Sequence, residues 1–183
     1  MTGDSSSTWT YIQSAVTNNA KYLNYVGFYG HNDMDMMEIG NGDLTLTEAR
    51  THFAAWAFMK SPILLGTDLS ALTTDELAVI KNTELLAFHQ DATYGAAAKQ
   101  YKTTNPPEYY SGQSTKGIHV FIINFTGAAS TRTVTFSEVA GLSAGVSYKV
   151  YNMWTKTDVG TFTNSYSASV ASHDTMAVLI TPV

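Results

Sequence analysis

The stretch His31-Asn32-Asp33-Met34-Asp35-Met36-Met37-Glu38-Ile39-Gly40-Asn41-Gly42, called the acidic loop below, is the most informative part of this chain. It places three carboxylates, an imidazole and two amide side chains between two apolar segments. The segment before it, Tyr25–Gly30, predicts a short buried strand, and the segment from Thr45 predicts a helix. Because α/β enzymes keep their chemistry on loops that join a strand to a helix, we expect site residues here.

Outward from the acidic loop, the chain up to about Gln90 alternates helical and strand patterns. Apolar residues at helical spacing predict a helix over 9–22. The pairs Thr45/Glu48 and Thr73/Glu76 are capping-box patterns and predict two further helices, the first ending before Ser61-Pro62. A short helix is expected over 84–88, and the apolar run 63–65 predicts a strand buried on both faces.

A different pattern begins near residue 98. Short β-rich runs are separated by Gly, Ser, Asn and Asp, after chain breaks at Asn105-Pro106-Pro107 and Ser111-Gly112. This spacing is typical of an antiparallel sandwich. We therefore predict an α/β unit over residues 1–95 and an all-β unit over residues 96–183. The expected strands are 118–125, 132–136, 146–154, 159–162, 166–170 and 176–181.

Composition excludes several kinds of partner. Of 183 residues only 14% are charged, the formal net charge is −5, and there is no basic run, so nucleic acid and anionic membranes are poor partners. The absence of Cys excludes disulfides and thiolate metal sites. No apolar run is long enough to span a membrane. A surface rich in Thr, Ser, Asn and Gly is typical of secreted fungal proteins, so we predict an extracellular location.

The acidic loop alone leaves four interpretations open. Asp33, Asp35 and Glu38 are hard oxygen ligands that could bind a divalent cation. They could instead hydrogen-bond sugar hydroxyls, or one of them could act in acid/base chemistry. In the fourth interpretation Asp33 and Asn32 only fix the loop backbone.

Other polar residues have simple structural interpretations. Asp4 lies at the entry to the first helix, where a carboxylate is favourable against the helix dipole. Asp68 follows the 63–65 run and could be a site residue or the cap of a turn. The five His residues do not cluster in sequence, which argues against a His-based metal site. Asn124-Phe125-Thr126 matches a glycosylation acceptor, but it lies in an apolar run, so we expect a structural role.

Several motifs together resemble the α-galactosidases of glycoside hydrolase family 27. The acidic loop is similar to their N-D-P-D-M-L-E-x-G-N-G signature, which is highly specific. The similarity covers essentially the whole chain. It continues through Thr51-His52-Phe53, Trp56-Ala57, Met59–Gly66, Asp68, Gln90-Asp91, Tyr151-Asn152-Met153-Trp154, Gly160, Val170 and His173.

The resemblance implies a fold and a set of site residues. The family fold is a (β/α)8 barrel followed by an antiparallel β-sandwich, so this chain is expected to be α/β plus all-β, the C-terminal part of a barrel and then a sandwich. Retaining glycosidases use two carboxylates roughly 5 Å apart. Thr2-Gly3-Asp4 resembles the end of the family's W-R-x-T-G-D motif, which makes Asp4 the expected acid/base. Asp35, Met36 and Asp33 are the expected galactose-binding residues, with no metal and no cofactor.

The sequence departs from the family pattern in important places. Nothing in the 183 residues matches the K-Y-D motif that carries the nucleophile, or the Trp-Asp-Asp sugar-binding loop. Met34, His31 and His89 stand where the family usually has Pro, Trp and Asn. A barrel needs about 250 residues, so we interpret the chain as the C-terminal portion of such an enzyme, started at an internal Met.

These departures leave three functional readings. The first is an α-galactosidase sequence that is inactive, or nearly so, as an isolated chain. The second is a non-catalytic, lectin-like galactose-binding protein on the same scaffold. In the third, an N-terminal barrel segment or a homo-oligomer completes the site.

Overall fold

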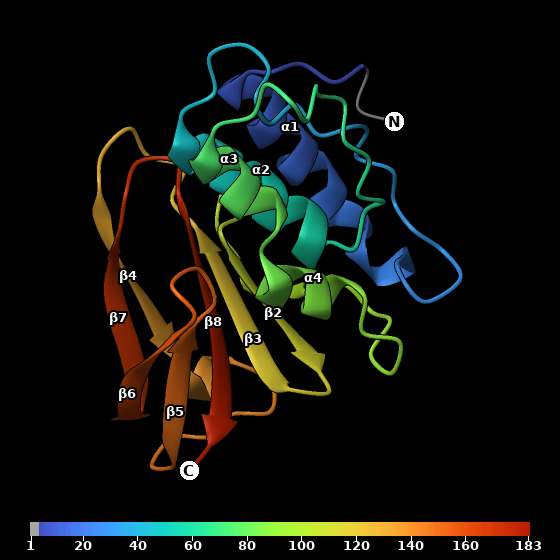
Figure 1. The fold of residues 1–183 in the computed structure, drawn as a ribbon. Helices are drawn as coiled ribbons and strands as arrows, with labels where there is room; N and C mark the ends of the chain where they lie inside the picture. The colour runs from blue at the N-terminus through green and yellow to red at the C-terminus, as the bar shows by residue number, and fades with distance from the viewer. Residues whose placement is uncertain (1–3) are drawn as a thin grey trace.

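The computed structural model describes residues 4–183, and its helices lie on one side of a β-sheet (Figure 1). Both predicted capping boxes are confirmed, at the starts of α2 (Leu46–Phe58) and α3 (Thr74–Ile80). The predicted first helix is α1 (Trp9–Asn19), which continues as the 3₁₀ helix η1 (Ala20–Tyr25). The fourth helix is α4 (Thr83–His89). Apart from Arg50, every residue of α2 from Glu48 onward is buried, so α2 is the central element of this half.

The two strands predicted in the N-terminal half, over 25–30 and 63–65, are wrong. Residues 25–30 form an exposed turn closed by one antiparallel bridge, and Tyr29 is 97% exposed. The 63–65 run makes one parallel bridge, between Leu65 and Met37, and Leu64 is 51% exposed. Apolar character alone predicted burial on both faces, but each segment is covered on one side only: Val26 lies in the core and Ile63 packs against it, while Tyr29 and Leu64 stay exposed.

The C-terminal half contains a six-stranded antiparallel sheet of order β1-β2-β3-β8-β5-β6 and a two-stranded sheet β4-β7. The predicted runs match β3 to β8. The bounds are β1 Lys99–Lys102, β2 Tyr109–Ser114, β3 Gly117–Ile123, β4 Ser130–Thr135, β5 Ser147–Asn152, β6 Thr157–Thr163, β7 Ser165–Val170 and β8 Thr175–Pro182, with a 3₁₀ turn η2 at Phe136–Glu138.

Strands β1 and β2 were not predicted, and β2 was missed because Ser111-Gly112 was taken as a chain break. In the structure Gly112 lies inside β2, and a Cβ at this position would be 2.7 Å from the Phe88 ring of α4. Glycine within a strand often marks such a close approach rather than a turn. The helical half therefore packs directly on β2.

The central strand β3 of the six-stranded sheet is buried on both faces, whereas the edge strands β1 and β6 are mostly exposed. Along β3, Phe121 and Ile123 belong to the core shared with the helices, whereas Val120 and Ile122 belong to the core shared with β4 and β7. This alternation follows the two-residue period of a strand. Because the first core joins residues from α1 to β8, the division into 1–95 and 96–183 stays a prediction.

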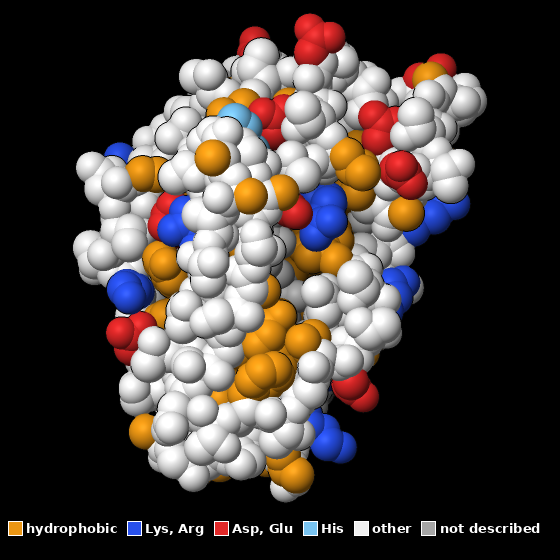
Figure 2. Space-filling view, turned by 90° about the vertical axis from the view of Figure 1, so that its left-hand side faces the viewer, with side chains coloured by type: hydrophobic (Ala, Val, Ile, Leu, Met, Phe, Trp, Pro, Cys, Tyr) orange, Lys and Arg blue, Asp and Glu red, His pale blue; other side chains and the backbone are white. Residues whose placement is uncertain are grey.

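The surface agrees with the low charge content of the sequence. Figure 2 shows the side of the molecule that carries β4 and β7, where uncharged polar atoms and backbone cover most of the area and charged side chains are scattered. Within residues 4–183, no helix is both long enough and apolar enough to cross a membrane.

Candidate functional site

The acidic loop is held by its backbone to the buried face of α2. The Trp56 indole Nε1–H donates to the Asp35 carbonyl at 2.7 Å, and the Glu38 amide donates to Nε2 of His52 at 3.0 Å. Asp35 has φ 70°, a left-handed conformation that Asp adopts more readily than most residues. Met37 then makes an isolated parallel bridge with Leu65, in which the Met37 amide donates to the Leu64 carbonyl at 2.8 Å and the Gly66 amide donates to the Met37 carbonyl at 3.0 Å. The loop conformation is therefore fixed from one side.

The Asp35 carboxylate joins two segments thirty residues apart. Its Oδ2 accepts a hydrogen bond of 2.8 Å from the Ser5 amide, and its Oδ1 accepts one of 2.8 Å from the Met36 amide. An ionised carboxylate offers about four lone-pair sites, so acceptor capacity remains for a ligand hydroxyl. Asp35 is partly exposed. The position is suitable for binding a polar ligand.

Asp4 is exposed and directly precedes Ser5. Because Ser5 is hydrogen-bonded to Asp35, the residue next to the candidate acid/base contacts the acidic loop. The motif residues Thr2 and Gly3 lie outside the described residues. Asp4 precedes α1, and Asp35 lies in the acidic loop that follows η1. The Ser5–Asp35 hydrogen bond joins these two segments.

The other two predicted ligand contacts differ in character. The Asp33 Oδ1 accepts from the Asp35 amide at 2.8 Å, so Asp33 shapes the loop as the structural interpretation suggested. Asp33 is exposed, and the hydrogen bond to the Asp35 amide uses only its Oδ1. Met36 lies against Gly66 and stays 43% exposed, as a side chain that contacts a ligand would.

Sequence reasoning missed a second link between the two segments. The Ser5 hydroxyl donates to Glu38 Oε1 at 2.5 Å, and the Asn41 amide donates to Glu38 Oε2 at 2.6 Å. From the sequence, Glu38 was considered for cation binding, sugar binding or acid/base chemistry, yet its carboxylate binds Ser5 and Asn41. Ser5, His52 and Trp56 carried no signal of this role, because each contact spans at least fourteen residues.

The remaining candidates do not join this site. Asp68 Oδ1 accepts from both the amide and the hydroxyl of Ser70, which lowers the pKa of Asp68 and identifies it as a turn residue. His31 and His89 each bond a backbone carbonyl, of Lys60 and Ser61 respectively. In the described part of the chain, no three His, Asp or Glu residues are grouped so that they could hold a metal ion.

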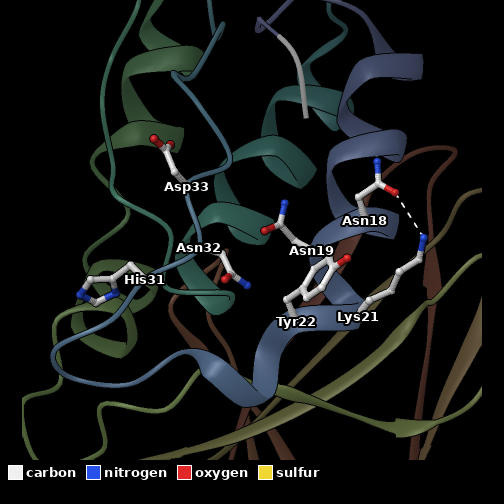
Figure 3. Close-up of a pocket in the computed structure, with 7 residues that line it drawn as sticks. All are labelled: Asn18, Asn19, Lys21, Tyr22, His31, Asn32 and Asp33. Atoms are coloured by element: carbon white, nitrogen blue, oxygen red, sulfur yellow. Dashed lines mark hydrogen bonds between the residues drawn. The ribbon is translucent and has the colours of Figure 1, made fainter. Parts of the chain in front are cut away.

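A cavity of about 530 Å³ opens beside the acidic loop (Figure 3). Of the four predicted site residues, Asp33 lines it. In Figure 3, Asn32 points toward Asn19 and Tyr22, whereas the side chains of His31 and Asp33 point away from α1. The full lining is Asn18, Asn19, Lys21, Tyr22, His31, Asn32 and Asp33.

Comparisons with known proteins agree with the fold and the motifs. Residues 2–91 match the family model described as "Alpha galactosidase A", and residues 104–180 match "Alpha galactosidase C-terminal beta sandwich domain". The chain is 43% identical to a probable α-galactosidase B of Penicillium simplicissimum, over 98% of this chain and 44% of that protein. It is 38% identical to the one of Aspergillus oryzae, over the same shares. The chain thus spans less than half the length of these relatives.

Solved structures show the same arrangement. The α-galactosidase I of Mortierella vinacea superimposes with a TM-score of 0.87 at 24% identity, covering 93% of this chain and 44% of that one. The Saccharomyces cerevisiae α-galactosidase bound to raffinose gives a TM-score of 0.83 at 18% identity, covering 94% and 51%. At these identities the likeness establishes the fold.

The barrel portion and the antiparallel sandwich that follows it both match family models, which places this chain in a family of glycoside hydrolases. More narrowly, it belongs to the α-galactosidase family, glycoside hydrolase family 27.

Proposed function

We propose that this chain carries the acid/base and sugar-binding part of a retaining α-galactosidase site that hydrolyses terminal α-D-galactosyl residues. In this proposal Asp4 is the acid/base, Asp35 and Asp33 accept hydrogen bonds from galactose hydroxyls, and Met36 lies against the sugar. The observation that carries it is the 2.8 Å hydrogen bond from the Ser5 amide to Asp35, which brings the residue after Asp4 onto the sugar-binding carboxylate.

The chemistry needs a second carboxylate. In a retaining mechanism the acid protonates the glycosidic oxygen while a nucleophilic carboxylate attacks the anomeric carbon. The residue that acted as the acid then acts as a base and activates water. Asp4 is solvent-exposed, so it can exchange protons with water between the two steps. The 183 residues contain no K-Y-D motif. The nucleophile would therefore come from outside this sequence, and we expect the isolated chain to be inactive or nearly so.

Exposed apolar side chains next to the site support completion by further polypeptide. Leu64 is 51% exposed, Leu65 38% and Leu69 52%, and they belong to the segment that contains Gly66, which Met36 lies against. We propose that these residues and the α1-side cavity contact the remaining barrel segments. A homo-oligomer is the competing occupant. We also propose an extracellular location for the assembled protein.

Titration calorimetry of the purified chain with galactose tests the binding part. We expect measurable binding, weakened at least tenfold by Asp35→Asn and unchanged by Asp43→Asn, which removes a charge from an exposed turn immediately after the acidic loop. Absence of galactose binding by the chain would refute the assignment. Release of galactose from an aryl α-galactoside at ordinary enzyme rates would refute the need for an external nucleophile.

A lectin-like role is the second candidate function. A complete acidic loop without a nucleophile motif in the same chain favours it for the isolated polypeptide. Native mass spectrometry separates this reading from completion by a partner. A monomer that binds galactose without turnover supports the lectin-like role, and assembly with an N-terminal barrel polypeptide that restores hydrolysis supports the enzyme.

A further inference from the structure

The acidic loop is attached to α2 at two polar points, and both involve fully buried side chains. His52 and Trp56 are each 0% exposed, and they are four residues apart, which places them on one face of α2. Their rings meet edge to face with centroids 4.1 Å apart. Trp56 donates to the carbonyl of Asp35, and His52 accepts from the amide of Glu38.

The protonation state of His52 is dictated by this geometry. A ring nitrogen that accepts from an amide N–H carries no proton, so Nε2 of His52 is bare and the imidazole is neutral with its proton on Nδ1. Burial supports this state, because it lowers the pKa of His52 to about 3. The Nδ1 has no hydrogen-bond partner among the described residues. A buried N–H left unpaired is destabilising, and the one hydrogen bond of the ring goes to the loop.

The two loop residues that are attached to α2 also bind Ser5. Asp35 and Glu38 are the attached residues, and their carboxylates bind the amide and the hydroxyl of Ser5. The left-handed φ of Asp35 directs its backbone into this arrangement. A continuous set of hydrogen bonds therefore runs from α2, through the loop backbone and two carboxylates, to the residue next to Asp4.

We propose that His52 and Trp56 are positioning residues. They fix the backbone of the acidic loop, and thereby the positions of Asp35 and Asp4 relative to a galactosyl ligand. Neither side chain touches the ligand in this proposal. The sugar-related part rests on the proposed function, whereas the fixation of the loop does not. The test therefore needs one measurement that involves no sugar.

Amide hydrogen exchange by NMR on the 183-residue chain supplies that measurement. His52→Leu removes the acceptor, and we expect the Glu38 amide to exchange at least tenfold faster while amides of the β-sheet change little. His52→Gln places an amide oxygen near the former Nε2 and should restore most of the protection. Trp56→Phe should affect residues 35–36 in the same way. Phe58→Leu is the matched control, since Phe58 is equally buried but stacks on Tyr110 and Phe121 at the sheet.

Galactose calorimetry on the same variants adds the functional readout. We expect His52→Leu to raise the galactose Kd about tenfold, with His52→Gln and Phe58→Leu close to the parent chain. A Glu38 amide that exchanges no faster in His52→Leu than in Phe58→Leu would overturn the inference, because the effect would then be general loss of stability. If the parent chain binds no galactose, the proposed function fails, and the exchange data alone decide whether His52 fixes the loop.

Discussion

Replacing Asn124 by Ala should destabilise the sandwich far more than a surface change would. Asn124 is 0% exposed, and its Nδ2 lies within hydrogen-bond distance of three carbonyl oxygens, those of Ala128 at 2.9 Å, Val170 at 3.1 Å and Ala171 at 2.9 Å. Its Oδ1 accepts from Arg132 at 2.8 Å, and also from the amide and hydroxyl of Thr126. The side chain thus ties the end of β3 to β4 and to the β7–β8 turn.

The magnitude follows from what the Asn124 variant leaves unpaired. Each buried group that loses its partner costs about 1–3 kcal/mol, and two N–H donors are lost together with an acceptor of Arg132. We expect a loss of about 3–5 kcal/mol, a large share of the 5–15 kcal/mol typical of a domain. Urea denaturation followed by tryptophan fluorescence measures it.

The same residue is the acceptor of the Asn-Phe-Thr glycosylation motif, which makes Thr126→Val a matched control. Thr126 is exposed, so this variant abolishes the motif and costs about 1 kcal/mol at most. Peptide mass analysis of the chain secreted from a eukaryotic host should show Asn124 unmodified, because its Nδ2 is already bonded. A glycan at Asn124 in folded protein, or equal costs for the two variants, would refute the reasoning.

Three further predictions concern the stability of the chain. Burial lowers the pKa of His52 to about 3 and of His119 to about 4, so below pH 6.5 the unfolded chain binds protons that the folded chain does not. The free energy of unfolding should therefore fall by about 2 kcal/mol per histidine from pH 7 to pH 5, and urea denaturation should show His119→Gln reducing that fall by about 2 kcal/mol. Glu48→Gln keeps the α2 cap but loses the charge facing His173 at 2.7 Å, so it should lower the free energy of unfolding by under about 1 kcal/mol. Glu48→Ala also removes the cap and should lower it by about 2 kcal/mol in the same denaturation assay. Gly112→Ala forces a Cβ toward the Phe88 ring and should cost about 1–3 kcal/mol, and thermal melting that shows no loss would contradict the close contact.

Features that depend on neighbouring residues in sequence were predictable. The capping boxes at Thr45 and Thr73 were correct because the cap and its partner are three residues apart. The strand alternation in the C-terminal half was readable for the same reason, since each face repeats every two residues. The family motif then supplied the fold of the whole chain.

Features that depend on distant residues were not predictable. The apolar segment at 25–30 looked like a buried strand, but Tyr25 is 79% exposed because nothing in the described chain packs on it. Gly112 looked like a break because its partner Phe88 is far away in sequence. The candidate site shows the same limit. The motif identified Asp35, whereas the attachment of its carboxylate to Ser5 across thirty residues needed the structure.

The site is built asymmetrically, and this separates binding from catalysis. On the α2 side, the backbone of the acidic loop is fixed by two fully buried side chains, and Asp35 and Glu38 in turn fix Ser5. Leu64 and Leu65, in contrast, remain exposed. In the proposed function, galactose contacts residues of the fixed acidic loop, whose carboxylates the chain already orients. In the same proposal, bond cleavage needs a second carboxylate, so addition of an N-terminal barrel polypeptide should raise kcat from near zero far more than it tightens galactose binding.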